Sequence, residues 1–164
     1  ARLGWLKQRR ALATTDADQT AAVGRSIAAV LRPGDVVALI GDLGAGKTTL
    51  VRGAARALGV TDHVTSPTFT LAQTYQGRLP IAHLGAYRLG QVDEEEAELA
   101  LAAAGPGAVV FLEWPDALGD TFDAPAITVT IDHTGADGRA LQIDVVDDAQ
   151  HAALSAALAA GGLA

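Results

Sequence analysis

Several residue types are scarce in this chain, and each scarcity excludes a class of protein. The 164 residues include no cysteine, which excludes disulfides, thiolate metal sites and cysteine nucleophiles. Aromatic residues are limited to two Trp, two Tyr and three Phe, so Ala, Val, Leu and Ile must build most of the core. No apolar run approaches the roughly 20 residues that cross a bilayer. No charged-then-apolar leader resembles a signal peptide, so we expect a cytoplasmic protein without a membrane segment.

Positive charge is scarce as well, and part of it is concentrated at the start. The formal net charge of −7 argues against a general nucleic-acid-binding surface. Four basic residues fall within the first ten positions, namely Arg2, Lys7, Arg9 and Arg10. This basic arm could touch RNA, but a frayed terminus or an expression remnant is the simpler interpretation. The chain starts with Ala1 rather than Met, which suggests that the natural N-terminus precedes it.

The length and the pattern of apolar residues predict one domain with alternating strands and helices. We expect residues 1–13 to form a flexible basic N-terminal segment and residues 14–164 to form a single nucleotide-binding domain. Helices are predicted at 16–31, 49–58, 93–104 and 147–160, and extended segments at 35–40, 63–75, 79–87, 108–112, 127–131 and 141–146. The last two strands read as a β-hairpin. The expected fold is an α/β three-layer sandwich with a mostly parallel sheet and an antiparallel C-terminal hairpin.

The most informative motif contains one of only two lysines in the chain. Residues 41–48 read Gly-Asp-Leu-Gly-Ala-Gly-Lys-Thr, which matches the phosphate-binding pattern G-x-x-x-x-G-K-[ST]. A predicted strand precedes it and a predicted helix follows it. In such a loop the backbone N–H groups and the helix N-terminus attract phosphates, Lys47 reaches the β- and γ-phosphates, and Thr48 ligates magnesium. The alternative is a glycine-rich turn without a ligand. We predict a nucleoside triphosphate site with Mg²⁺.

Phosphoryl transfer also needs a carboxylate near the metal, and Glu113 is the best candidate. It follows the apolar strand at 108–112, and ligands collect at the carboxyl ends of strands in open α/β sheets. A solvated strand-end carboxylate is the alternative. Thr68 could sense the γ-phosphate or belong to a plain β-turn. Trp114 could be a packing corner or an aromatic lid.

Two other polar features are given structural interpretations. His83 lies in an apolar stretch, where a lone histidine is more often a packing residue than a catalyst. The acidic run at 93–96 is interpreted as a solvated helix face with its charge near the helix N-terminus.

Four segments together resemble a known family. Residues 41–49, 65–71 (Thr-Ser-Pro-Thr-Phe-Thr-Leu), 83–89 and 113–115 (Glu-Trp-Pro) occur in this order in the TsaE family. These are bacterial ATPases of the threonylcarbamoyladenosine tRNA-modification pathway. The match covers roughly residues 14–146. The loop belongs to a vast superfamily, whereas the later elements are more specific.

The resemblance implies ATP or ADP and Mg²⁺ as cofactors, TsaD- and TsaB-type partner proteins, and indirect action on tRNA. It implies Glu113, Thr68 and Lys47 as catalytic residues and Thr48 and Glu113 as metal ligands. The implied nucleotide-binding residues are Thr15, Asp42, Leu43, Gly44, Ala45, Gly46, Lys47, Thr48, Thr49, Trp114 and Arg139. Within this set the resemblance assigns Thr15 to the adenine pocket, Trp114 to a place beside the nucleotide and Arg139 to an approach to ATP.

One position departs from the family. The family pattern H-x-D-x-Y-R-L reads His-Leu-Gly-Ala-Tyr-Arg-Leu at residues 83–89, so Gly85 stands where an aspartate is expected. Loss of a carboxylate near Mg²⁺ is expected to slow hydrolysis, by about a hundredfold or more if that group acts in the transition state. ATP binding should survive because the loop is intact.

Two alternative functions remain open from the sequence. One is an ATP-dependent binding module with little or no hydrolysis, which Gly85 favours. The other is a small P-loop kinase, which is less expected because Arg78, Arg88 and Arg139 lack the spacing of an arginine-bearing lid.

Overall fold

The computed structural model describes residues 8–42, 44–67, 72–85, 94–114 and 125–163. The elements are β1 (Gln8–Thr14), α1 (Ala17–Ala28), β2 (Val36–Ile40), α2 (Lys47–Ala57), β3 (Ala72–Tyr75), β4 (Ile81–Gly85), α3 (Glu94–Ala104), β5 (Val109–Trp114), β6 (Ile127–His133), β7 (Arg139–Val145) and α4 (Asp148–Ala160). All four predicted helices are found, within three residues of their predicted ends. In the described part of the chain, no helix has the length and apolar character needed to span a bilayer.

The strands form one mixed sheet in the order β1-β7-β6-β2-β5-β4-β3. The central part of the sheet is parallel: β6 pairs with β2, β2 with β5, and β5 with β4 in parallel orientation. The β6–β7 hairpin is antiparallel, as predicted, but so are β1 with β7 and β3 with β4. Half of the neighbouring pairs are therefore antiparallel, and the prediction of a mostly parallel sheet holds only for the centre. Antiparallel strands lie at both edges of the sheet rather than at one.

Strand β1 is not predicted by the sequence. Gln8–Thr14 runs antiparallel to β7 over its full length, from Gln8 opposite Val145 to Thr14 opposite Arg139. Residues 8–13, predicted to belong to a flexible segment, are therefore an edge strand of the sheet, while residues 1–7 lie outside the described part. The predicted boundary at residue 14 cuts through this strand.

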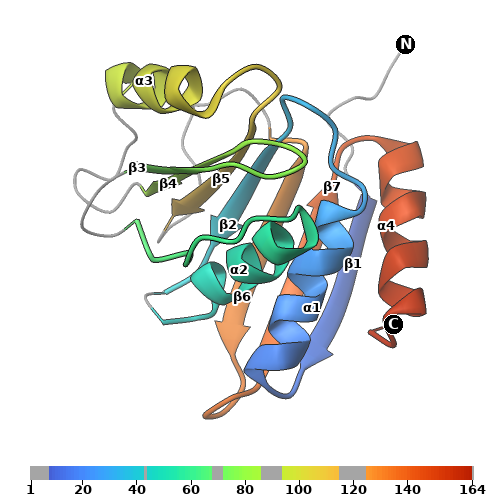
Figure 1. Ribbon diagram of the computed structural model, residues 1–164. Helices are drawn as coiled ribbons and strands as arrows, with labels where there is room; N and C mark the ends of the chain where they lie inside the picture. Colours follow the sequence, from blue (N-terminus) through green and yellow to red (C-terminus); the bar gives the residue numbers. More distant parts are fainter. Residues whose placement is uncertain (1–7, 43, 68–71, 86–93, 115–124, 164) are drawn as a thin grey trace.

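The two faces of the sheet are covered by different helices (Figure 1). Helices α1, α2 and α4 cover what we call the first face, where Leu39, Phe111 and Ile143 belong to one buried cluster with residues of these helices. Helix α3 packs on the second face, where Ala100 and Ala104 join a smaller cluster with β4 and β5. Because strand side chains alternate, Val109, Phe111 and Glu113 of β5 face α2, whereas Val110 and Leu112 face the opposite way.

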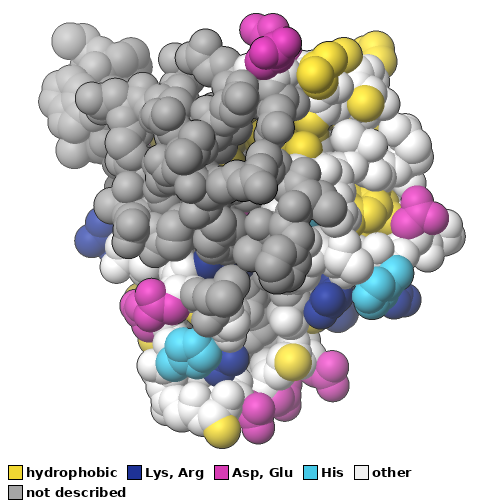
Figure 2. All heavy atoms as spheres, turned by 90° about the vertical axis from the view of Figure 1, so that its left-hand side faces the viewer, with side chains coloured by type: hydrophobic (Ala, Val, Ile, Leu, Met, Phe, Trp, Pro, Cys, Tyr) yellow, Lys and Arg dark blue, Asp and Glu magenta, His cyan; other side chains and the backbone are white. Residues whose placement is uncertain are grey.

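Helix α3 is less completely packed than the other helices. Its Leu99 and Leu101 have exposed fractions of 65% and 38%, and they are the exposed large hydrophobic residues of the described chain. Hydrophobic side chains reach the surface in the view toward this edge of the molecule (Figure 2). The helix is therefore held by small alanine side chains rather than by its leucines.

Helices α1 and α2 approach each other through glycine. A Cβ added at Gly53 of α2 would lie 1.9 Å from the carbonyl oxygen of Ala21, and one added at Gly24 of α1 would lie 2.0 Å from that of Leu50. Only glycine permits this backbone-to-backbone contact. The contact fixes α2, and therefore the loop that leads into it, against the remainder of the first face.

Candidate functional site

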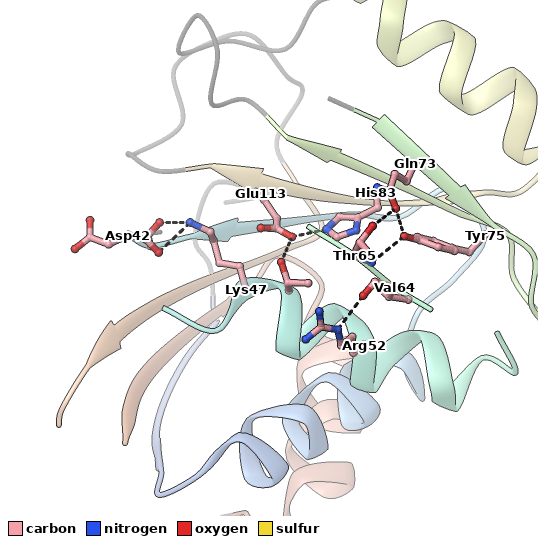
Figure 3. Close-up of polar contacts among 11 residues, drawn as sticks. Asp42, Lys47, Arg52, Val64, Thr65, Gln73, Tyr75, His83 and Glu113 are labelled. Atoms are coloured by element: carbon pink, nitrogen blue, oxygen red, sulfur yellow. Dashed lines mark hydrogen bonds and ion pairs between the residues drawn. The ribbon is translucent and has the colours of Figure 1, made fainter. Parts of the chain in front are cut away.

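The loop between β2 and α2 surrounds the side chain of Lys47. Gly46 has a φ of 114°, a left-handed conformation that favours glycine, directly before the first residue of α2. Lys47 begins α2 and turns back over the loop, where its Nζ donates to the carbonyl oxygens of Gly41 and Asp42 (Figure 3). Burial lowers the pKa of Lys47, and the negative charges of Glu113 and Asp42 offset part of this shift.

A cavity of about 240 Å³ opens beside this loop. Its lining combines the loop, the first turn of α2, the segment before β3, the end of β5 and the start of β7: Gly44, Gly46, Lys47, Thr48, Thr49, Ser66, Glu113 and Arg139. A smaller cavity of about 50 Å³ shares Gly46, Thr49 and Arg139 with it and continues to Ala17, Thr20 and Asp137. The cavity thus brings together predicted site residues from three separate parts of the chain.

Glu113 is buried at the carboxyl end of β5, with 1% of its surface exposed. Its Oε2 accepts hydrogen bonds from the Thr48 hydroxyl at 2.9 Å and from Nε2 of His83 at 2.5 Å (Figure 3). Burial raises the pKa of Glu113, but the His83 hydrogen bond and charge, the Thr48 hydrogen bond and the Lys47 charge outweigh it and hold the pKa below its usual value. The solvated-carboxylate alternative is therefore wrong.

His83 lies on β4 and is completely buried. The sequence favours a packing role for His83, but the side chain contacts the carboxylate of Glu113, which lines the cavity. Its Nδ1 has no hydrogen-bond partner among the residues that the structure describes. The motif at 83–89 offered a signal, because His83 stands two residues before the position of the family aspartate.

Arg139, the first residue of β7, holds the loop from the side of the hairpin. Its Nε donates to the carbonyl oxygen of Ala45 at 2.6 Å, and its Nη2 to that of Gly44 at 3.4 Å. Its Nη1 also donates to Gly138 within its own hairpin. The guanidinium therefore lies beside the phosphate-binding motif and lines both cavities.

Other predicted residues are placed less directly. The N–H of Thr15 donates to Gln19 at 2.8 Å, and Thr15 lines neither of the two cavities. Leu43, Thr68 and the Trp114 side chain lie outside the described residues. Ser66, which lines the larger cavity, was missed, although it belongs to the quoted Thr-Ser-Pro-Thr segment.

Gly85 is the last residue of β4 and pairs with Glu113 of β5. A side chain at this position would alternate to the same face as His83. Glycine supplies no side-chain group there. Among the described residues that line the larger cavity, Glu113 is therefore the one that carries a carboxylate. The described chain holds no group of three or more His, Asp and Glu that could bind a metal ion. The Thr48 hydroxyl and the Glu113 carboxylate are the side chains here that could contribute to a shared site.

This combination of a mixed α/β sheet and a glycine-rich loop entering a helix agrees with the comparisons with known proteins. The family model for threonylcarbamoyl adenosine biosynthesis protein TsaE matches residues 14–141. The chain belongs to this family.

Individual relatives and a solved structure give the same result. The chain is 36% identical to the TsaE protein of Bacillus subtilis over 135 residues, covering 81% of this chain and 84% of the relative. It is 40% identical to that of Streptomyces coelicolor over 119 residues, covering 70% and 80%. The crystal structure of Bacillus subtilis YdiB is similar with a TM-score of 0.72 and 30% identity, over 93% of this chain and 95% of YdiB.

Proposed function

We propose that this chain is a Mg²⁺-dependent ATPase of the P-loop type, with the three-layer fold of that class. It would support threonylcarbamoyl transfer to adenosine 37 of tRNA together with TsaD- and TsaB-type proteins, in the cytoplasm. The tRNA-modification pathway follows from the family and from the names of the relatives. The acidity of the chain favours indirect rather than broad contact with tRNA.

The hydrogen bond from Thr48 to Glu113 carries this proposal. It joins the end of the phosphate-binding motif to the strand-end carboxylate, 65 residues further along the chain, at the wall of the cavity. A hydroxyl and a carboxylate are hard oxygen donors, which is the ligand chemistry that Mg²⁺ prefers. Because the pKa of Glu113 is lowered, the group is ionised near neutral pH and suited to a cation. A bound Mg²⁺ would neutralise charge on the phosphates.

The remaining residues of the site would bind and orient the nucleotide. Lys47 now donates to loop carbonyls, and phosphate oxygens would replace these acceptors. The N–H groups at the start of α2 point in the direction that attracts anions. Arg139 would keep the loop in place through Gly44 and Ala45 rather than only by contacting ATP.

Titration calorimetry with ATP tests the binding step. The unaltered chain should bind ATP, and more tightly with Mg²⁺ than with EDTA. Lys47→Ala should weaken binding by about 10- to 100-fold, the value of a charge-assisted hydrogen bond. Arg56→Ala is the matched control, because Arg56 is exposed in the last turn of the same helix. The proposal fails if the unaltered chain binds no ATP or if both variants bind equally well.

Gly85 favours a second candidate, an ATP-dependent binding module with little or no hydrolysis. Phosphate release from Mg-ATP, measured with the TsaD–TsaB pair present, separates the two candidates. Equal release by the unaltered chain and by Gly85→Asp supports the ATPase, with Thr48 and Glu113 sufficient at the metal. Release by Gly85→Asp alone, with ATP-dependent pair binding by both, supports the module.

A further inference from the structure

A buried chain of hydrogen bonds joins three elements at the site. His83 of β4 and Thr48 of α2 both direct a hydrogen bond to the same oxygen, Oε2 of Glu113. His83 has no exposed surface and Glu113 has 1%. Burial of a carboxylate is costly unless donors satisfy it, and these two bonds help to fix the direction in which Oε2 points.

His83 is the more rigid of the two donors. Its ring is carried by a central strand, with β3 pairing on one side and β5 on the other. Across β3 it is paired with Gln73, whose Oε1 accepts from the hydroxyls of Thr65 and Tyr75 (Figure 3). A second polar cluster, made of Gln73, Thr65 and Tyr75, therefore lies on the side of His83 away from Glu113. Thr48, by contrast, is half-buried at the cavity and is itself one of the candidate ligands.

The absence of a side chain at Gly85 increases the importance of this orientation. Gly85 and Glu113 are register partners at the same ends of β4 and β5. Where the family pattern has two carboxylates, the described cavity lining has Glu113 alone. Carboxylates that bind metal ions are themselves hydrogen-bonded, and these donors orient them and raise metal affinity, so a lone carboxylate depends strongly on its donors.

We propose that His83 is a positioning residue: its Nε2–H holds Oε2 of Glu113, and this orients the carboxylate toward a divalent cation that accompanies the nucleotide. The inference rests on the proposed nucleotide-binding function and adds the residue on which its metal dependence relies. His83 acts through Glu113 and need not touch the nucleotide itself.

A pair of isosteric amides tests this role. In His83→Gln the amide nitrogen reaches the place of Nε2 and can still donate to Glu113. In His83→Asn the amide nitrogen takes the place of Nδ1, which has no partner among the described residues, and falls short of the carboxylate. Both variants replace the ring with a neutral amide, so they differ mainly in how far the amide N–H donor reaches.

The measured quantity is the gain in ATP affinity on adding Mg²⁺, obtained by calorimetry with Mg²⁺ and with EDTA. We expect the unaltered chain and His83→Gln to keep this gain, and His83→Asn to lose at least about tenfold of it. Binding in EDTA should change little in any of the three. In a Glu113→Gln background, His83→Asn should have no further effect, because its partner is already altered.

Two kinds of binding result would contradict the inference. Equal Mg²⁺ gains in the Gln and Asn variants, or equal losses in both, would show that a donor at the Nε2 position is not what matters. Lack of ATP binding by the unaltered chain would overturn the proposed function and this inference with it. If His83→Asn does not fold, nitrogen NMR of the four histidines in the unaltered, ATP-bound chain replaces it. Adding Mg²⁺ should then shift the His83 Nε2 signal most, and an unchanged signal would overturn the inference.

Discussion

The two faces of the sheet differ in what packs against them and in which of them carries the candidate site. The first face carries three helices, a core rich in Val, Ile and Leu, and the glycine contact between α1 and α2. The second face carries α3 over a smaller cluster in which alanine predominates. Glu113 and Arg139, which line the cavity, lie on the first face together with His83. Their chain neighbours Leu84, Leu112 and Ala140 alternate to the second face. The candidate site thus lies on the face with the larger buried cluster.

This difference shows how the fold can position the site. Lys47 and Thr48 are carried by α2, whose distance from α1 is fixed by backbone contact at Gly53. Glu113 is carried by β5, which lies between two parallel neighbours. The second face stabilises the same strands from behind but contributes no side chain to the cavity lining among the described residues. Changes to the two faces should therefore separate stability from binding.

The largest effect should follow Gly53→Val. The added Cβ would overlap the carbonyl oxygen of Ala21, and α1 and α2 cannot separate without opening the first face. The cost should exceed about 5 kcal/mol, which is a large part of the stability of an ordinary domain. We expect no cooperative unfolding transition in chemical denaturation.

The control for Gly53→Val introduces the same residue at Ala57→Val, an exposed position of the same helix. Here only the lower helix propensity of valine acts, at about 0.5 kcal/mol. If both variants unfold at the same denaturant concentration, the close approach of the two helices is not important for stability.

The next effect compares neighbours on β5 that face opposite ways. Phe111→Ala removes a completely buried ring from the first face, beside His83, and should cost about 3–5 kcal/mol. Leu112→Ala should cost nearer 2 kcal/mol, because α3 and its alanines can move toward the space that is left. Chemical denaturation measures both costs, and ATP calorimetry should show weaker Mg²⁺-dependent binding only for Phe111→Ala. Equal losses in both measurements would mean that the faces do not differ as described.

A smaller effect is expected where the first face meets the loop. In Arg139→Lys a single ammonium group replaces the guanidinium fork, so the bonds to Gly44 and Ala45 cannot both be kept. ATP affinity should fall by about 3- to 10-fold, with the free energy of unfolding changed by less than about 1 kcal/mol. Gln142→Ala, on the same strand but the opposite face, should leave the affinity unchanged. A loss of affinity in the Gln142 variant, or none in the Arg139 variant, contradicts this role.

The sequence predicted the parts of the site that local patterns encode. The motif at 41–48, the strand before it and the helix after it are each defined by a short run of residues, and their chemistry follows from residue type. Glu113 was predicted because a continuous apolar run ends directly before it, and its contact with Thr48 agrees with that expectation.

The parts that could not be predicted depend on pairing between distant segments. Strand β1 is recognised as a strand only through β7, more than 120 residues later. The contact of His83 with Glu113 requires β4 and β5 to be parallel and in a register that no local pattern encodes. The pairing of β3 with β4 is different, because the strands are joined by residues 76–80 alone and a connection this short favours antiparallel neighbours.

The smallest effect should come from the most exposed large hydrophobic residue of α3, the helix that covers the second face. Leu99 of α3 has an exposed fraction of 65%, so Leu99→Gln should change the free energy of unfolding by no more than about 0.5 kcal/mol. The adjacent Ala100 has 6% exposed and belongs to the buried cluster, so Ala100→Gln must force a longer polar side chain against β4 and β5. That change should cost about 2 kcal/mol or more. Chemical denaturation of the two variants therefore compares the cost of the same new residue, glutamine, at adjacent positions. A larger cost at Leu99 than at Ala100 would mean that the leucine, and not the buried alanines Ala100 and Ala104, holds α3 on the sheet.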